Sequence, residues 1–243
     1  RLFGLFEDVV WRATTEAEVP EIENAIGREA DIQVAPDLPP ASILPDFAFD
    51  EKPPKTAGQA DLIFASRIAP KKNLQFLLEQ LERITLTRLT LTIVGQVEDS
   101  EYWRACKNQI ESLSGRIDVR ILGGVSNDEL LELMKRSHFF LLPTLNENFG
   151  YVILEALAAG CPLIISENTI WSDVADRKAG FVIPLRDEKS WQAAITSATA
   201  MEQDEYRSLS LAARGIAEEW LAKPDHDAAM ARTLEYVIAK DER

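Results

Sequence analysis

Residues 143–166 read PTLNENFGYVILEALAAGCPLIIS, and this stretch predicts the end of a strand, a loop, a helix and the next strand in succession. The helical part, FGYVILEALAAG, is almost entirely apolar, so we expect it to be buried. Its only charged side chain is Glu155, and a carboxylate is costly to bury unless something donates a hydrogen bond to it. The stretch therefore predicts a buried helix with one acid whose place in the interior needs an explanation.

Apolar runs and amphipathic stretches alternate on both sides of this segment. We expect strands at 61–68, 89–95, 117–122, 138–143, 162–166 and 180–184, with helices between them. This alternation predicts an α/β fold built on a doubly wound, Rossmann-like, mainly parallel sheet. Ligands of such sheets bind beyond the carboxyl ends of the strands, so we expect the site in the loops there.

Two local signals mark helix ends. Ser126 followed by Glu129 forms a capping box that predicts the start of the helix between the third and fourth strands. From about residue 187 onward the pattern is helical, with a break expected near Pro224 because proline cannot continue a helix.

Composition excludes several classes of protein. The chain of 243 residues has 26 Lys and Arg against 40 Asp and Glu, a net charge of −14, which argues against nucleic acid as a partner. The hydrophobic content of 46% excludes general disorder, and no apolar run reaches the roughly 20 residues of a membrane-spanning helix. With only two cysteines and two widely separated histidines, we expect no metal site.

Carboxylates and a helix start converge near residue 150. Glu147 lies in the loop before the helix, Tyr151 and Glu155 share a helix face, and Gly150 allows close backbone approach. Together with the N–H groups of a helix amino terminus, this arrangement suits a phosphate and sugar hydroxyls. The alternative is that Glu147 is a solvated loop acid and Glu155 an early-helix acid favoured by the helix dipole.

A second group of candidates is SRIAPKKN at 66–73, where Arg67 and Lys72 lie between a strand and a helix. Paired cations in this position suit a diphosphate, although a solvated basic loop is the alternative. Gly95, Gly123 and Gly124 follow two other strands, and they either wall a nucleotide base or form ordinary turns.

Taken together, these segments resemble the carboxy-terminal, donor-binding half of the GT-B fold glycosyltransferases of group 1, or family 4. The resemblance covers about residues 61–200, and its most specific part is the E-x7-E element formed by Glu147 and Glu155. Asn148, Asn73 and Thr144 depart from the commoner residues of that family, without removing a group that the chemistry needs.

The resemblance implies a retaining transfer of a sugar from a nucleotide-sugar donor to an unknown acceptor, without a metal ion or other cofactor. It implies that the catalytic residues are Glu147, Arg67 and Lys72, with the two cations on the diphosphate. The donor-binding residues that it implies are Asn148, Phe149, Gly150, Tyr151, Glu155 and Gly123. Glu155 would accept hydrogen bonds from the ribose.

The resemblance also implies a division of the chain. Residues 1–37 would be the remnant of an amino-terminal acceptor domain, 38–60 a Pro-rich linker, and 61–243 the nucleotide-sugar-binding domain with a helical tail. We expect the isolated fragment to be inactive, because the rest of the acceptor domain is missing. A nucleotide-sugar epimerase of the same fold, or a non-catalytic module that binds a nucleotide sugar, is the alternative. We expect a cytoplasmic protein and leave open that the missing domain attaches it to the inner face of a membrane.

Overall fold

The computed structural model describes residues 9–26, 30–35, 43–85, 88–113, 115–222 and 225–241. The chain forms two compact units, one of residues 41–221 and one of residues 1–40 with 222–243.

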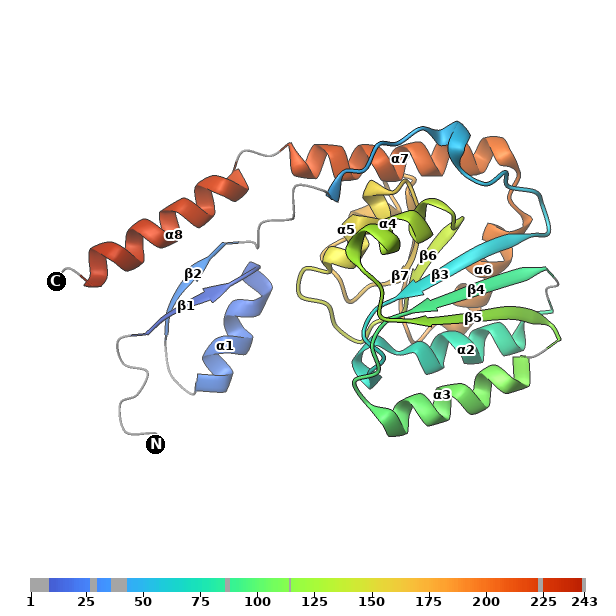
Figure 1. Cartoon of the computed structure of the whole chain (residues 1–243). Helices are drawn as coiled ribbons and strands as arrows, with labels where there is room; N and C mark the ends of the chain where they lie inside the picture. Colours follow the sequence, from blue (N-terminus) through green and yellow to red (C-terminus); the bar gives the residue numbers. More distant parts are fainter. Residues whose placement is uncertain are drawn as a thin grey trace. The chain divides into compact units, whose positions relative to one another are not determined.

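The larger unit is built on a sheet of six strands that all pair in parallel (Figure 1). The strands are β3 (Ala60–Ala65), β4 (Leu89–Val94), β5 (Ile117–Gly123), β6 (Phe139–Leu142), β7 (Leu163–Ser166) and β8 (Gly180–Ile183). Their spatial order is β5-β4-β3-β6-β7-β8, so the chain runs outward from β3 in one direction and then outward from β6 in the other. All six predicted strands and the doubly wound parallel sheet are confirmed.

Helices cover both faces of this sheet (Figure 1). On one face α2 contacts α3 and α6, and on the other α5 contacts α4 and α7. Their bounds are α2 (Leu74–Arg83), α3 (Ser100–Leu113), α4 (Asn127–Lys135), α5 (Tyr151–Ala158), α6 (Glu188–Ala200) and α7 (Gln203–Leu221), with short 3-10 turns at η3 (Phe49–Glu51), η4 (Pro70–Lys72) and η5 (Ser172–Val174). The capping box of Ser126 and Glu129 is present at the start of α4, as predicted.

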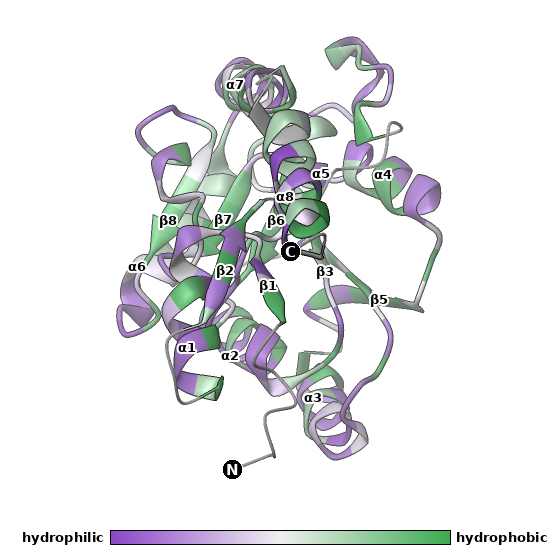
Figure 2. Cartoon of the chain, turned by 90° about the vertical axis from the view of Figure 1, so that its left-hand side faces the viewer, coloured by the Kyte–Doolittle hydropathy of each residue, from purple (hydrophilic) through white to green (hydrophobic). Residues whose placement is uncertain are grey.

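Burial on both faces explains the continuous apolar strands. All four residues of β6 and all four of β7 are buried. Figure 2 shows β7 and β8 largely in hydrophobic colours. A parallel sheet with helices on both faces has no solvated side that would favour alternating polar residues. The two cysteines, Cys106 and Cys161, are free and buried in this unit.

Part of the predicted Pro-rich linker is packed into the larger unit. The ammonium group of Lys52 donates to the carbonyls of Lys135 (2.9 Å) and Ala159 (3.2 Å), at the carboxyl ends of α4 and α5. Lys55 likewise donates to the Thr199 and Met201 carbonyls, at the end of α6. These lysines supply donors to helix-terminal carbonyls that have no partner within their own helix.

The smaller unit contains two parallel strands, β1 (Val10–Ala13) and β2 (Asp31–Val34), joined through η1 (Glu16–Glu18) and α1 (Val19–Ile26). Helix α8 (Asp225–Asp241) contacts β2, and the Asp31 carboxylate accepts hydrogen bonds from Tyr236 and Lys240, each 2.9 Å long. Helix α8, the last part of the predicted helical tail, therefore belongs with the amino-terminal segment, whereas α6 and α7 belong to the larger unit. The predicted domain of 61–243 included all three helices. The break expected near Pro224 lies outside the described residues.

None of the helices in the described ranges combines the length and the apolar character needed to cross a membrane.

Candidate active site

The candidate site lies where the strand order reverses, between β3 and β6. The loop at 66–73 follows β3 and the loop at 143–150 follows β6, so both start at the carboxyl edge of the sheet. They are bonded to each other, because the Leu145 N–H donates to the Lys71 carbonyl over 2.8 Å and the Thr144 hydroxyl donates to the same carbonyl over 3.1 Å. The fold thus joins two segments that the sequence separates by about 75 residues, at the usual ligand position of such sheets.

Lys72 and Glu147 form an ion pair at this junction. Both side chains are largely buried, with 9% and 14% of their surfaces exposed. Each charge therefore compensates the other in a place where an unpaired charge would be costly. Sequence reasoning predicted both residues for the site, but not that they contact each other.

Arg67 has a different environment, although it belongs to the same loop. Its guanidinium lies 2.7 Å from the Glu98 carboxylate, and the two side chains are 66% and 50% exposed. The structure therefore brings Lys72 to Glu147 and directs Arg67 toward solvent and a different acid.

Gly150 allows the loop to enter α5. Its backbone is left-handed, with φ of 80°, and it immediately precedes the first residue of the helix. A Cβ atom at this position would lie 2.8 Å from Cγ of Glu147, too close for a real contact. Glycine is thus required both by the left-handed turn and by the nearness of the Glu147 side chain.

Aromatic side chains hold the loop just before this turn. The indole N–H of Trp171 donates to the Phe149 carbonyl over 2.7 Å, in the interior. The ring of Phe149 packs against Tyr151, with centroids 4.4 Å apart, and against Trp171. Asn148 is half-buried and stands in the sequence between Glu147 and Phe149. Sequence reasoning did not single out Trp171, because nothing in the sequence shows that the loop after β7 lies beside the loop after β6.

Glu155 is buried on the second turn of α5, as the sequence predicted. Burial alone raises the pKa of its carboxyl group to about 7. The hydrogen-bond donor that we expected to explain its burial is not found among the described residues. Near neutral pH the group is therefore poised between its neutral and charged forms, and it retains the capacity to accept hydrogen bonds.

The glycines at the other strand ends have distinct positions. Gly95 follows β4, and a Cβ there would lie 1.8 Å from the Ser66 carbonyl oxygen, so only glycine allows the loops after β3 and β4 to approach this closely. Its N–H donates to the Gly123 carbonyl over 2.7 Å. Gly123 itself ends the edge strand β5, two strands away from β3 in the sheet order.

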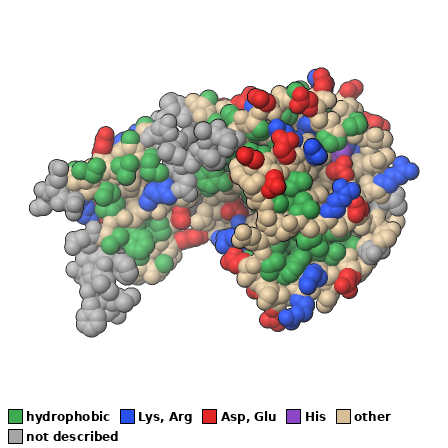
Figure 3. All heavy atoms as spheres, viewed as in Figure 1, with side chains coloured by type: hydrophobic (Ala, Val, Ile, Leu, Met, Phe, Trp, Pro, Cys, Tyr) green, Lys and Arg blue, Asp and Glu red, His purple; other side chains and the backbone are tan. Residues whose placement is uncertain are grey.

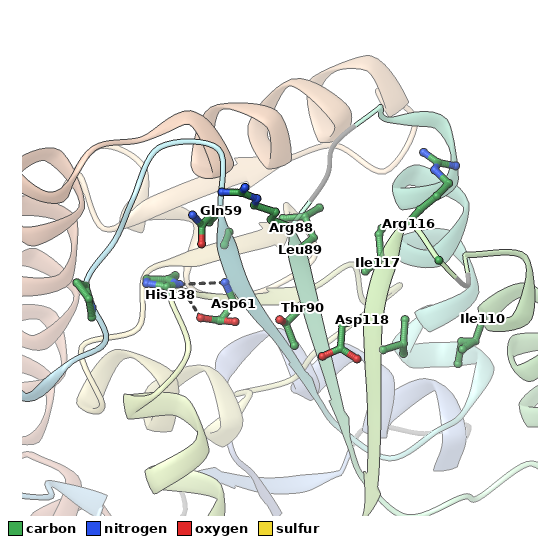
Figure 4. A pocket seen from close by; sticks show the side chains of 14 residues that line it. Gln59, Asp61, Arg88, Leu89, Thr90, Ile110, Arg116, Ile117, Asp118 and His138 are labelled. Carbon is green, nitrogen blue, oxygen red and sulfur yellow. Dashed lines mark hydrogen bonds and ion pairs between the residues drawn. The ribbon is translucent and has the colours of Figure 1, made fainter.

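A cavity of about 760 Å³ lies at the opposite edge of the sheet, at the amino ends of β3, β4 and β5 (Figure 4). His138 and Asp61 line it, and Nδ1 of His138 accepts a hydrogen bond from the Asp61 N–H over 2.9 Å. His138 is buried and burial lowers its pKa, which agrees with a neutral core histidine. None of the predicted site residues lines this cavity. In the described part of the chain, no cluster of three or more His, Cys, Asp or Glu side chains could hold a metal ion.

Comparison with known families gives one match that spans most of the larger unit. The family model described as "Glycosyl transferases group 1" matches residues 46–215. These residues include both loops at the β3–β6 junction.

Individual relatives are more distant. A glycogen synthase of Mycobacterium tuberculosis is 30% identical over 156 residues, which cover 62% of this chain and 36% of that protein. O-antigen chain mannosyltransferase B of Escherichia coli is 28% identical over 167 residues, 67% of this chain and 42% of that protein. The chain thus spans less than half the length of these two relatives.

Solved structures confirm the fold. The crystal structure of Anabaena Alr3699/HepE in complex with UDP and glucose superposes with a TM-score of 0.72 at 19% identity, over 92% of this chain and 62% of that one. WaaG, a glycosyltransferase involved in lipopolysaccharide biosynthesis, superposes with a TM-score of 0.68 at 17% identity, over 91% of this chain and 60% of that one.

Proposed function

The chain belongs to the glycosyl transferases group 1 family, and from this premise we propose that it binds a nucleotide-diphosphate sugar at the junction of β3 and β6 and serves in the transfer of that sugar to an acceptor. The observation that carries the proposal is the largely buried ion pair of Lys72 and Glu147, immediately before the amino terminus of α5. A ligand that carries both an anionic group and hydroxyl groups can replace such an ion pair. Its anionic group attracts the lysine, and its hydroxyl groups donate hydrogen bonds to the carboxylate.

In this exchange Lys72 and Glu147 each take a new partner from the ligand. A diphosphate at this edge attracts the ammonium group of Lys72, and the N–H groups of the first turn of α5 favour the same negative charge. Glu147 then loses its cation partner and accepts hydrogen bonds from hydroxyls of the donor sugar. Arg67 leaves the exposed Glu98 at little cost, because an exposed ion pair contributes little to stability. Together the two cations stabilise the negative charge of the departing nucleotide.

The remaining roles follow the resemblance to the family. Glu155 accepts hydrogen bonds from the ribose, Asn148, Gly150, Tyr151 and the Phe149 backbone contact the donor, and Gly123 borders the base. We propose retention of anomeric configuration and no metal ion, with Arg67 and Lys72 supplying the positive charge at the diphosphate. The UDP and glucose named for Anabaena Alr3699/HepE support a nucleotide sugar as the ligand class.

We further propose that this chain is the donor-binding part of a larger transferase and does not transfer sugar alone. Its relatives are more than twice the length of the matched segment. Transfer needs an acceptor held against the donor sugar, and such positioning supplies a large part of the rate enhancement of many enzymes.

The first experiment measures donor binding by this chain with UDP, GDP, ADP and their sugars. A ligand that binds only the native state raises the melting temperature, and calorimetry then gives its affinity. We expect one base to bind more tightly than the others. If none of these ligands binds, the proposed function is wrong.

The second experiment tests Glu155 through the pH dependence of binding. A nucleotide-diphosphate sugar has no group of its own that titrates near neutral pH, whereas Glu155 has a pKa of about 7. If binding of the ribose requires Glu155 in its ionised form, the affinity for the donor should fall by about tenfold from pH 8 to pH 6. Binding near pH 7 should then release protons. Glu155→Gln should abolish this dependence. A dependence that persists in Glu155→Gln would assign the titration to another group.

A third experiment assays sugar transfer by this chain and by a longer form that includes an acceptor domain. We expect donor binding by both and transfer by the longer form alone. Equal transfer by both would refute the donor-binding-part proposal and leave the donor site unaffected.

A further inference from the structure

Strand β5 leaves a long edge of the sheet without a neighbour in the described residues. It is the outermost strand on its side and spans Ile117–Gly123, whereas the opposite edge strand β8 spans only Gly180–Ile183. An edge strand presents unpaired backbone N–H and C=O groups and is a template for another strand.

The carboxyl-terminal part of β5 exposes large apolar side chains. Ile121 and Leu122 are 47% and 46% exposed, although both belong to the strand. Figure 3, viewed as Figure 1, shows hydrophobic side chains gathered on the front of the larger unit, where Figure 1 draws β5 and α3. By contrast, none of the large hydrophobic residues of β8 is among the exposed ones.

The register of β5 limits how a second strand can pair with it. Ile117 to Ile121 pair regularly with β4, and a shift then places Gly123 opposite Val94, so that Leu122 is extra. The regular part of the strand is therefore five residues long, and its central residue is Val119. A bulge of this kind ends regular pairing.

Charge complementarity identifies the partner. Asp118 and Arg120 flank Val119, are 58% and 60% exposed, and form an ion pair with each other, 2.8 Å long. An exposed pair of this kind contributes little to stability, so both side chains can exchange partners at little cost. If a second β5 lies antiparallel about a two-fold axis at Val119, Asp118 of each strand faces Arg120 of the other, and Ile117 faces Ile121. A two-fold axis at Arg120 would instead place two arginines opposite each other. Opposite charges across a sheet stabilise the pair, and like charges destabilise it.

We propose that β5 is an interface with a second copy of this chain, in which two β5 strands pair antiparallel about Val119 and join two six-stranded sheets. Asp118 and Arg120 stand one residue before and one residue after Val119, so each charge meets its opposite when two β5 strands pair antiparallel about Val119. The same charges disfavour pairing with strands of other sequences. A two-fold interface is self-complementary by definition, and the β5 sequence meets that requirement. Gly123, which we place beside the base, belongs to the same strand but lies beyond its five regularly paired residues. The ion pair that carries the proposed function lies at the junction of β3 and β6, so the interface does not rest on the proposed function.

Sedimentation analysis of the 243-residue chain over a dilution series tests this proposal. About 0.15 M salt limits the range of charge effects to about 8 Å and so screens the repulsion between two acidic copies. We expect a concentration-dependent dimer. Asp118→Arg and Arg120→Asp should each raise the dissociation constant by about tenfold or more, because each places two like-charge pairs across the interface. The double variant Asp118→Arg/Arg120→Asp restores both pairs and should recover the dimer.

Asp176→Arg is the matched control, because it makes the same change of charge at an exposed position near the other edge of the sheet. It should leave the dissociation constant unchanged. As an independent readout, Val119→Cys should form a disulfide between copies, since facing residues of antiparallel strands lie within disulfide range. A chain that is monomeric throughout, or a dimer that all these variants leave unchanged, would overturn the proposal.

Discussion

The two cations of the loop after β3 have opposite environments. Lys72 is enclosed with Glu147 at the junction of β3 and β6, while Arg67, five residues earlier, meets Glu98 in solvent. Both pairs join a cation of this loop to an acid from a different loop. Sequence reasoning treated Arg67 and Lys72 as equal halves of one clamp.

The two pairs differ in the free energy that is lost when one partner is removed. In solvent, water replaces the lost partner, and an exposed pair contributes little. In the interior the remaining charge has neither water nor a partner. Each charge of the enclosed pair therefore needs a partner, and a ligand of the right charge can take that place. The charges of the exposed pair have no such need, because water solvates them.

The largest effect should follow from removing Lys72. Lys72→Met leaves Glu147 with an uncompensated charge and should destabilise the protein by about 3 to 5 kcal/mol. Urea denaturation measures this change. The double variant Lys72→Met/Glu147→Gln removes both charges and should regain at least half of the loss. If the double variant is as unstable as the single one, the cost comes from packing rather than from charge.

Glu155 sharpens the comparison, because its buried carboxyl group has no hydrogen-bond or ion-pair partner among the residues that the structure describes. Burial raises its pKa to about 7 from 4.5, so the folded state binds more protons than the unfolded state between these values. Stability should therefore fall as pH rises from about 4.5 to 7 and level off above. Glu155→Gln should remove this loss and stabilise the protein at pH 8 by about 2 to 3 kcal/mol, with little effect at pH 4. Denaturation at several pH values checks this, and an equal effect at both ends would contradict it.

Variants of Trp171 test whether its hydrogen bond or its ring holds the loop that carries Glu147. Trp171→Phe removes the donor to the buried Phe149 carbonyl and should cost about 1 to 2 kcal/mol more than Trp191→Phe. Trp191 is a matched control because its buried indole N–H has no hydrogen-bond partner among the described residues. Thermal unfolding of both variants gives the comparison. Equal losses would show that the ring, and not the hydrogen bond, holds the loop.

Arg67 should give the smallest effect. Arg67→Ala breaks only an exposed pair and should change stability by less than about 1 kcal/mol. The same variant should still weaken the binding of a nucleotide diphosphate, because the proposed role of Arg67 requires the ligand. A large loss of stability would mean that the exposed pair resembles the enclosed one, and the comparison would fail.

The sheet could be predicted from the sequence because its signals are local. Each strand is a short apolar run, and Ser126 with Glu129 marks a helix start without any tertiary information. The parallel order then placed the loops of Lys72 and Glu147 at one edge, as parallel strands require.

What the sequence could not show depends on contacts between distant segments. It did not show that Lys72 rather than Arg67 faces Glu147, since both lie in the same loop and the choice depends on how Glu98 is placed. It did not show that Trp171 bonds to Phe149, or that α8 joins Asp31 through Tyr236 and Lys240. Periodicity identifies a helix but not the strand on which it packs.

Lys71 and Lys72 allow the most direct test of the central claim, that the enclosed cation at the junction of β3 and β6 binds the donor diphosphate. They are adjacent and carry the same charge, but Lys71 is exposed and Lys72 is buried. Calorimetric titration with the nucleotide-diphosphate sugar that binds the unaltered chain should give at least about tenfold weaker binding for Lys72→Ala. Binding to Lys71→Ala should change by less than about threefold, the effect of a nearby screened charge. Equal affinities for the two variants would contradict the claim.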